Sequence, residues 1–291
     1  MTPLVFFLIL TSASVHVCWN ALGKRSGDKV AFALGTLIVS TLLLAPVFVI
    51  RRLTSPGPWT GEALVCVVAS GFFEALYFAL LFSAYQHVDL SVAYPLSRGV
   101  APIFALVAGG LLLQEWIGPT EGVAIATILA GVGAVSISSG QKGTRRGLIF
   151  AIATGAMIAG YHVVDRRAMT LPQRPDAYEF LFLKHVCIVI FLPFFLAFRG
   201  EGVFKRLVAE CRRAPRTVVA VGLMTPLAYF LILLALTRSN VTYVSAGRNI
   251  GIVLSTLVGK IALREKVSHK RWFGVFLILV GIAALVLLGA H

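Results

Sequence analysis

The chain has 291 residues, of which 58% are hydrophobic and 13% charged, with a formal net charge of +14 and a mean hydropathy of +0.89. This balance excludes an ordinary water-soluble domain, because so much apolar surface cannot be hidden from water, and it indicates an integral membrane protein. The basic residues gather at the ends of apolar runs. We therefore expect contact with the lipid bilayer and its anionic headgroups, and no binding of nucleic acid.

Ten apolar runs of about 20 residues follow one another, each long enough to cross roughly 30 Å of hydrocarbon. The first has no basic stretch before it, so we interpret it as a span and not as a cleaved signal. Connections are short, and the longest, 199–216, is predicted to be a basic loop. The predicted fold is an all-α integral membrane protein with ten transmembrane helices, at 3–23, 29–50, 62–86, 90–113, 119–139, 147–168, 177–198, 216–237, 241–263 and 271–289.

Two arginines lie inside apolar runs at an offset of 150 positions, Arg98 and Arg248, and the same offset pairs Gly131 with Gly281. A charge at membrane depth is expensive and marks a functional site by default. A charge present in both copies of a repeat predicts a site at the interface between the copies.

The first predicted helix carries a polar stripe in which Ser12, His16, Asn20 and Lys24 follow at intervals of four. Adding 142 to these numbers reaches Thr154, Ile158, His162 and Arg166, so three of the four positions stay polar. Each half then holds five helices, an odd number, so the second half must cross the membrane in the opposite sense. We expect two inverted five-helix repeats, 1–140 and 147–291, as in secondary transporters.

The chain resembles the drug/metabolite transporter superfamily, and specifically its EamA-type members with two EamA repeats. The resemblance rests on His16-Val-Cys-Trp-Asn20, on Asp89 through Tyr94-Pro-Leu-Ser-Arg98-Gly, on Leu113-Gln-Glu115 and on Leu263-Arg-Glu-Lys266. The second copy departs from the pattern, with Ala246-Gly-Arg248-Asn and no prolines. The resemblance implies transport through a central cavity lined by the first, third, fourth, sixth, eighth and ninth spans, with the fifth and tenth at the periphery.

Arg98 lies between Pro95 and Pro102, and proline bends helices at the depth where transporters bind cargo. A guanidinium there holds a carboxylate, phosphate or phosphonate by two parallel hydrogen bonds. The competing interpretation pairs Arg98 with Glu74 as a structural ion pair. The candidate substrate-binding residues are Arg98, Arg248, Asn20, Tyr94, Tyr161, His162, Tyr229 and Asn249.

Three residues are candidates for proton coupling: Glu74, His16 and Asp165. Glu74 lies well inside a span, where burial favours the protonated form of a carboxyl and a nearby arginine favours its ionised form. Asp165 has the alternative of an interfacial ion pair beside Arg166, and histidines often act as neutral hydrogen-bonding partners.

Some polar residues in or near the spans have structural interpretations. Asn20 has the alternative of bonding between helices, and Lys184 and Lys260 are expected to extend toward the interface. Glu115 is interpreted as a loop anchor. The four cysteines show no metal or redox spacing, so we predict free thiols, no metal and no cofactor.

These features predict a secondary transporter of a small polar metabolite, in the export direction, working by alternating access. A multidrug exporter is the alternative within this class; a membrane enzyme would need a nucleophile or metal motif that the sequence lacks, and a scaffold would tolerate apolar replacement of the arginines. Loop lysines and arginines gather on the side away from the termini, which places both termini outside the cytoplasm of an inner, cell membrane. Monomer and homodimer both remain open.

Overall fold

The computed structural model describes residues 1–23, 26–88, 90–137, 144–197, 202–262, 264 and 267–288. Within these ranges ten helices are long and apolar enough to cross a membrane, as the hydropathy pattern predicts. The first half contributes α1 (Pro3–Gly23), α2 (Lys29–Thr54), α3 (Gly61–His87), α4 (Leu90–Leu113) and α5 (Pro119–Ile137). The second contributes α6 (Arg145–Thr170), α7 (Ala177–Ala197), α8 (Val203–Arg213), α9 (Pro215–Leu236), α10 (Val241–Gly247), α11 (Ile250–Ala262) and α12 (His269–Leu288).

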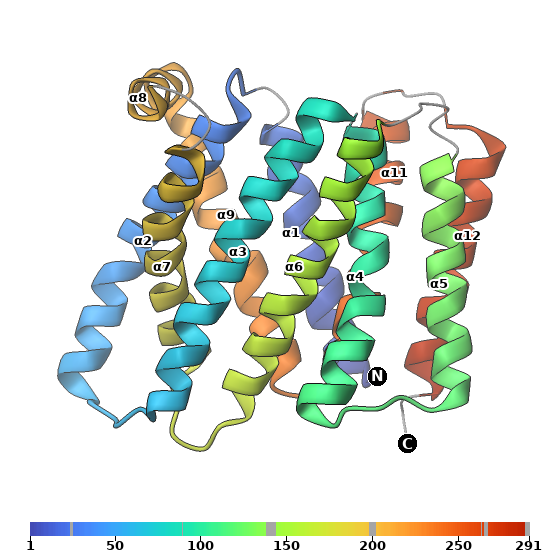
Figure 1. The fold of residues 1–291 in the computed structure, drawn as a ribbon, viewed down its shortest axis with the longest axis horizontal. Helices are drawn as coiled ribbons and strands as arrows, with labels where there is room; N and C mark the ends of the chain where they lie inside the picture. The colour runs from blue at the N-terminus through green and yellow to red at the C-terminus, as the bar shows by residue number, and fades with distance from the viewer. Residues whose placement is uncertain are drawn as a thin grey trace.

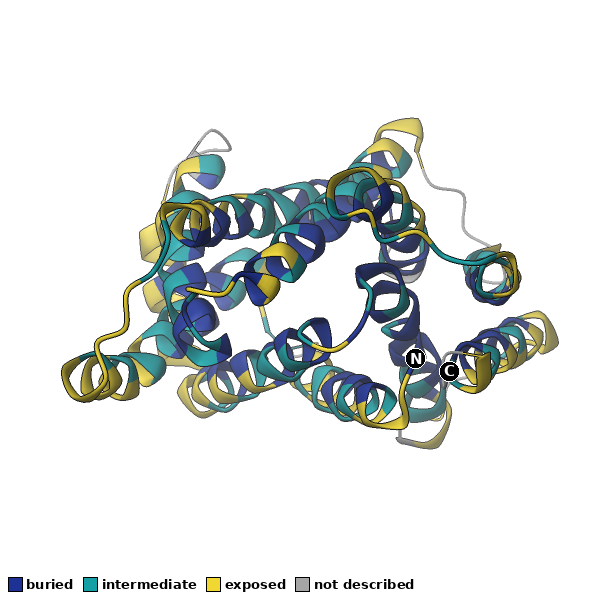
Figure 2. Cartoon of the chain, turned by 90° about the horizontal axis from the view of Figure 1, so that it is seen from below, coloured by how far each residue is buried: buried dark blue, intermediate teal, exposed yellow. Residues whose placement is uncertain are grey.

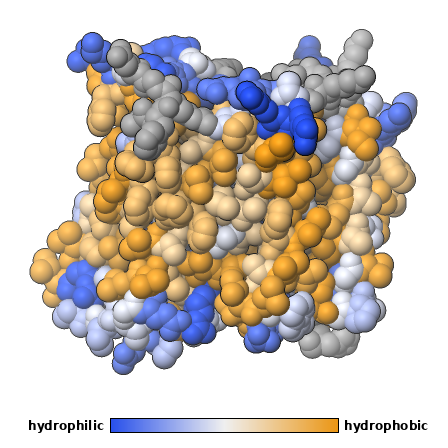
Figure 3. Space-filling view, in the orientation of Figure 1, coloured by the Kyte–Doolittle hydropathy of each residue, from blue (hydrophilic) through white to orange (hydrophobic). Residues whose placement is uncertain are grey.

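The spans run up and down in turn, so that α1 begins and α12 ends on the same side of the bundle (Figure 1). A hydrophobic band crosses the middle of the molecule between hydrophilic rims (Figure 3), which is the surface that a bilayer requires. Buried residues gather on the inward faces of the helices (Figure 2). Helices of the two halves interleave, since α3 and α4 both pack along α6 and α1 packs along α9.

The ninth predicted span is not one continuous helix, as the sequence suggested, but two. α10 ends at Gly247, Arg248 and Asn249 form a turn, and α11 begins at Ile250. Backbone hydrogen bonds across the turn span three residues instead of the four of an α-helix. The Asn249 N–H donates to the Ala246 carbonyl and the Gly251 N–H donates to the Arg248 carbonyl, both at 3.1 Å. Arg248 therefore lies where two half-helices meet, in a turn whose backbone groups pair with one another.

The prolines of α4 do not interrupt it. Pro95 and Pro102 both lie inside one continuous helix, Leu90–Leu113, which confirms the single span predicted at 90–113. A helix tolerates proline in a membrane when neighbouring groups satisfy the freed carbonyls. The interruption occurs in the second copy, at a glycine, an arginine and an asparagine.

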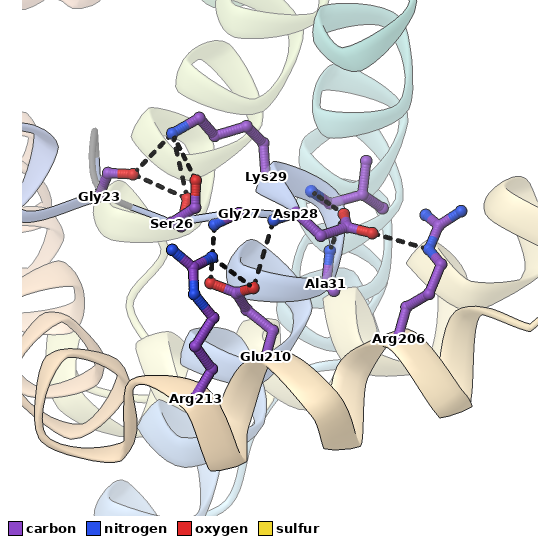
Figure 4. A network of polar contacts seen from close by, with 10 residues as sticks. Gly23, Ser26, Gly27, Asp28, Lys29, Ala31, Arg206, Glu210 and Arg213 are labelled. Carbon is purple, nitrogen blue, oxygen red and sulfur yellow. Dashed lines mark hydrogen bonds and ion pairs between the residues drawn. The ribbon is translucent and has the colours of Figure 1, made fainter.

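The basic connection between α7 and α9 contains α8, a helix that the sequence analysis described as a loop. This helix lies across the N-terminal end of α2 and is seen nearly end-on in Figure 1. The Glu210 carboxylate is buried and accepts the backbone N–H groups of Gly27 and Asp28, while Arg206 pairs with Asp28 at 2.8 Å (Figure 4). These contacts dock α8 onto the turn before α2.

α5 and α12 pair with each other at one end of the bundle (Figure 1). Glycines allow this approach: a Cβ on Gly131 would lie 2.6 Å from the Gly274 carbonyl oxygen, and one on Gly281 would lie 2.7 Å from that of Ala124. Close packing through small residues is a common means of helix association in lipid. The peripheral position expected for the fifth and tenth spans matches this arrangement.

Candidate functional site

The two intramembrane arginines each face a histidine of the same half. Arg98 donates from its guanidinium to Nε2 of His16 at 3.2 Å, and Arg248 donates to Nε2 of His162. Because a guanidinium has no acceptor, each imidazole must be neutral and accept at Nε2. This contact disfavours His16 as the proton carrier that the sequence analysis offered as one candidate.

The repeated contact does not follow the sequence offset used for the polar stripe. That offset pairs His162 with Asn20, one helical turn beyond His16. In the structure His162 nevertheless makes with Arg248 the same ring-to-guanidinium contact that His16 makes with Arg98. The two halves thus reach one chemical arrangement from neighbouring turns of α1 and α6.

Both arginines line one cavity at the centre of the bundle. Its wall comes from α1, α4 and the turn between α10 and α11, so the two halves share it. The volume is only about 10 Å³, room for roughly one water-sized sphere. Arg98 is 7% exposed, which places its charge among protein groups and away from lipid. The lining residues are Ile9, Ser12, Ala13, His16, Tyr94, Arg98, Arg248 and Gly251.

Tyrosine rings surround the two cations. The Arg98 guanidinium carbon lies 5.5 Å from the Tyr94 ring centroid, and that of Arg248 lies 5.7 Å from the Tyr229 centroid, both within the range of cation–π attraction. Tyr161 packs edge-on against Tyr229 and against Tyr77, with centroids 5.9 and 6.0 Å apart. The predicted residues Tyr94, Tyr161 and Tyr229 are thus brought together around the arginines.

The two candidate asparagines lie in different surroundings. Asn249 is 1% exposed beside the α10–α11 break, and neither polar atom of its side chain has a hydrogen-bond partner among the described residues. A buried amide without a partner is costly, so it is available to a ligand that enters the break. Asn20 is exposed and donates to the His16 carbonyl of its own helix at 2.8 Å, so the structure does not bring it to the arginines.

A second charged group lies beside the tyrosines, and it rules out two of the alternative interpretations and the expected position of Lys184. Glu74 pairs with Lys184 at 2.8 Å and not with Arg98. Asp165 is fully buried and also pairs with Lys184, at 2.9 Å, so it is no interfacial residue. Lys184 itself is fully buried and does not extend to the interface, whereas Lys260 is exposed near Trp272, as expected.

Lys184 is the functional candidate that sequence reasoning missed. Its ammonium lies 4.0 Å from the Tyr229 centroid and 4.6 Å from that of Tyr161. It stands in the second turn of α7, and this nearness to the helix end suggested an interfacial position. The rule that singled out the arginines, a charge inside an apolar run, applied to this lysine as well.

Ion pairs join the two halves on the side where α1 begins. Glu115 accepts from Arg166 at 2.6 Å and from the Val241 N–H at 2.9 Å, which agrees with its predicted role as a loop anchor. Arg167 of α6 pairs with Glu62 at the start of α3, and Arg51 at the end of α2 pairs with Asp176 before α7. These contacts hold this end of the two halves together.

The described cysteines are free, and no group of His, Cys, Asp and Glu within the described residues is arranged to hold a metal ion. Of the motifs singled out in the sequence, Lys24, Asp89, Leu263, Glu265 and Lys266 lie outside the described residues.

Comparison with known proteins agrees with this architecture. A sequence model described as the EamA-like transporter family matches residues 3–137 and again residues 145–287. No curated protein sequence matches the chain. A solved structure titled only as the crystal structure of a protein is 17% identical, with a TM-score of 0.74 and 98% of each chain covered. At this identity the solved structure shows a shared fold and no more.

Proposed function

Because the chain belongs to the EamA-like transporter family, we propose that it is a secondary transporter whose Arg98 and Arg248 hold an anionic group of a small polar cargo. The observation that carries the proposal is that both guanidinium groups, one from each repeat, line the same cavity. The family accounts for transport across a membrane. The anionic cargo class rests on the two arginines alone.

The chemistry of the cavity favours a carboxylate, phosphate or phosphonate. Guanidinium groups present paired N–H donors that fit these oxyanions. Each arginine already donates to a neutral imidazole, which orients it and leaves its positive charge uncompensated by that partner. The unpaired side-chain amide of Asn249 adds polar groups for the remainder of an amino acid or organic acid.

The small volume of the cavity supports alternating access. Pockets for small molecules usually measure about 300–1,000 Å³, far more than the space between these arginines. A cargo of amino-acid size therefore enters only when the repeats, which we place at 1–140 and 147–291, move apart. The ion pairs Glu115–Arg166 and Glu62–Arg167 join the two repeats, and opening toward the side of the termini requires them to break.

Ligand-induced thermal stabilisation of the purified protein in detergent tests the proposal. The probes are amino acids, dicarboxylates, phosphorylated and phosphonate metabolites, and cationic dyes. We expect one class of anion or zwitterion to stabilise the wild type but neither Arg98→Gln nor Arg248→Gln. Arg212→Gln, at an exposed position on α8, is the matched control and keeps the response.

Two results would overturn the assignment. Stabilisation by cationic dyes alone, retained in both arginine variants, would favour multidrug export and return the arginines to a structural role. Full retention of anion binding in Arg98→Gln would remove this residue from the site.

A further inference from the structure

Glu74, Asp165 and Lys184 form a buried charged cluster that joins α3, α6 and α7. The Lys184 ammonium lies between the two carboxylates, at 2.8 Å from Glu74 Oε2 and 2.9 Å from Asp165 Oδ2. One ammonium faces two carboxylates, so the cluster taken alone has one negative charge in excess. The excess charge has to be balanced, because an unpaired charge is costly in a buried site.

The two carboxylates differ in how they are satisfied. Asp165 is 0% exposed and accepts from the Ser70 hydroxyl, the Tyr229 hydroxyl and Lys184, so its oxygens are fully engaged. The side chain of Glu74 is 15% exposed, and Lys184 is the partner that the structure describes for it. Asp165 is therefore the fixed counter-ion of Lys184, whereas Glu74, partly exposed and with one described partner, is the less constrained carboxylate.

The cluster and the arginine cavity lie on either side of shared tyrosines. The Lys184 ammonium lies 4.0 Å from the Tyr229 ring centroid, and the Arg248 guanidinium carbon lies 5.7 Å from the same centroid. Tyr161 packs against Tyr229, and Lys184 lies 4.6 Å from its centroid. The titratable and charged groups around Glu74 are Tyr77 of α3, Tyr161 and Asp165 of α6, Lys184 and His185 of α7, and Tyr229 of α9. Beyond the tyrosines lie Arg98 and Arg248, each with its histidine partner, His16 or His162.

The net charge of the bundle core links the arginine cavity to the cluster of Glu74, Asp165 and Lys184. Arg98, Arg248 and Lys184 are cations, the two carboxylates are anions, and the histidines beside the arginines are neutral, so the ionised core has one positive charge in excess. A cargo with one negative charge neutralises this core. When Glu74 binds a proton the excess rises to two, and the core then attracts an anion more strongly.

We propose that Glu74 is a proton-binding site whose protonation favours anion binding at Arg98 and Arg248, so that proton and anion move across the membrane together. The inference rests on the proposed function of the arginines. A proton from water on the open side bonds to a Glu74 carboxylate oxygen, and Lys184 keeps its pairing with Asp165. By thermodynamic linkage, an anion at the arginines favours proton uptake at Glu74 to the same degree. Proton and anion therefore strengthen each other's binding, as cotransport requires. In the exchange of a cation for protons, each ligand instead weakens the binding of the other.

Infrared spectroscopy of the purified protein in lipid nanodiscs tests the coupling without a cargo. The carbonyl-stretch band of a protonated carboxylic acid is followed as a function of pH. We expect a component of this band to disappear in Glu74→Gln and to persist in Glu62→Gln, the control at an exposed carboxylate. Persistence of the whole band in Glu74→Gln would overturn the assignment of the proton site.

The arginine variants test the link between the sites. Removing a positive charge in Arg248→Gln should move the pH at which the Glu74 component is half-developed upward, because a nearby cation favours the ionised carboxylate. Arg248→Lys retains the charge and should restore the wild-type midpoint, which separates electrostatics from misfolding. Arg212→Gln should leave it in place.

The outcomes distinguish this inference from the proposed function. If the pH midpoint of the Glu74 infrared component is the same in Arg248→Gln, Arg98→Gln and the wild type, the coupling is overturned. This holds even where the two variants lose anion-induced stabilisation. A midpoint that moves while anion binding persists in those variants instead overturns the arginines as the cargo site, and with it the cotransport that rests on them.

Discussion

The Lys184 ammonium lies 2.9 Å from Asp165 Oδ2, and neither side chain is exposed to any measurable extent. Nineteen positions separate the two residues in sequence, on different helices of the second half. The pair is the fixed part of the charged cluster. Because it is buried, the loss of one partner should change the free energy of unfolding measurably.

Removing one partner of this pair should be strongly destabilising. Lys184→Met leaves Asp165 and Glu74 buried without their cation, and we expect a loss of about 3–5 kcal/mol in the free energy of unfolding. The double variant Lys184→Met/Asp165→Asn should recover part of the loss. Denaturant unfolding in mixed micelles measures both. Lys260→Met, at an exposed lysine, is the control, and an equal loss there would contradict the argument.

The imidazole of His16 should matter for anion binding through its hold on Arg98. His16→Ala removes the acceptor at 3.2 Å, and we expect the affinity for the most stabilising anion to fall about fivefold, the equivalent of about 1 kcal/mol for one hydrogen bond. His16→Gln retains an acceptor and should lose less. Equal binding in wild type and His16→Ala, measured by titration calorimetry, would show that Arg98 needs no orienting partner.

Packing between α5 and α12 should be sensitive to side-chain size at single glycines. In Gly131→Ala the new methyl group would meet the backbone of α12 within 3 Å, and we expect a loss of about 1–3 kcal/mol in the free energy of unfolding. Gly133→Ala is the matched control on the same helix, because nothing lies within 4 Å of a Cβ there. If thermal unfolding does not separate the two variants, the close approach of these helices is wrong.

The docking of α8 should depend on Glu210. Glu210→Gln weakens the charge-assisted bonds to the turn before α2, so α8 should leave the bundle more often. Cys211 reports this opening: burial and, to a smaller degree, the Glu210 charge raise the pKa of its thiol, so alkylation is followed at a pH high enough to ionise the thiol with and without Glu210. With Cys18 replaced by serine, we expect faster alkylation of Cys211 in Glu210→Gln. An unchanged rate would mean that other contacts hold α8.

The orientation of the chain is testable by labelling. We propose that the side with α8 and most basic loops faces the cytoplasm. In a cysteine-free background, Ser55→Cys between α2 and α3 should react with a membrane-impermeant maleimide added outside intact cells. Val208→Cys on α8, which is also exposed, should react only after lysis. The reverse pattern would place the termini in the cytoplasm.

The sequence by itself determined the membrane class, the spans and the duplicated arginines. Hydropathy and helical periodicity are local properties, so ten spans were predicted within a few residues of where the structure has them. Tyr94 and Tyr229, two of the candidate substrate-binding residues, lie beside the arginines, and Tyr161 packs against Tyr229, since intramembrane polar residues tend to face the bundle interior; their role in binding stays a prediction. The break at Arg248 and Asn249 was missed because proline is the more familiar breaker, although a helix between neighbours can accommodate it.

Only the tertiary structure decided which charges meet. The sequence argument offered Arg98 as a partner for Glu74, whereas the packing of α3 against α6 and α7 pairs it with Lys184. Asp165 and Lys184 each stand near the end of an apolar run, where hydropathy alone places them at the interface; neighbouring helices bury both. Pairing across helices depends on how the helices are rotated and how far each lies in the bundle, and neither quantity is encoded in any single span.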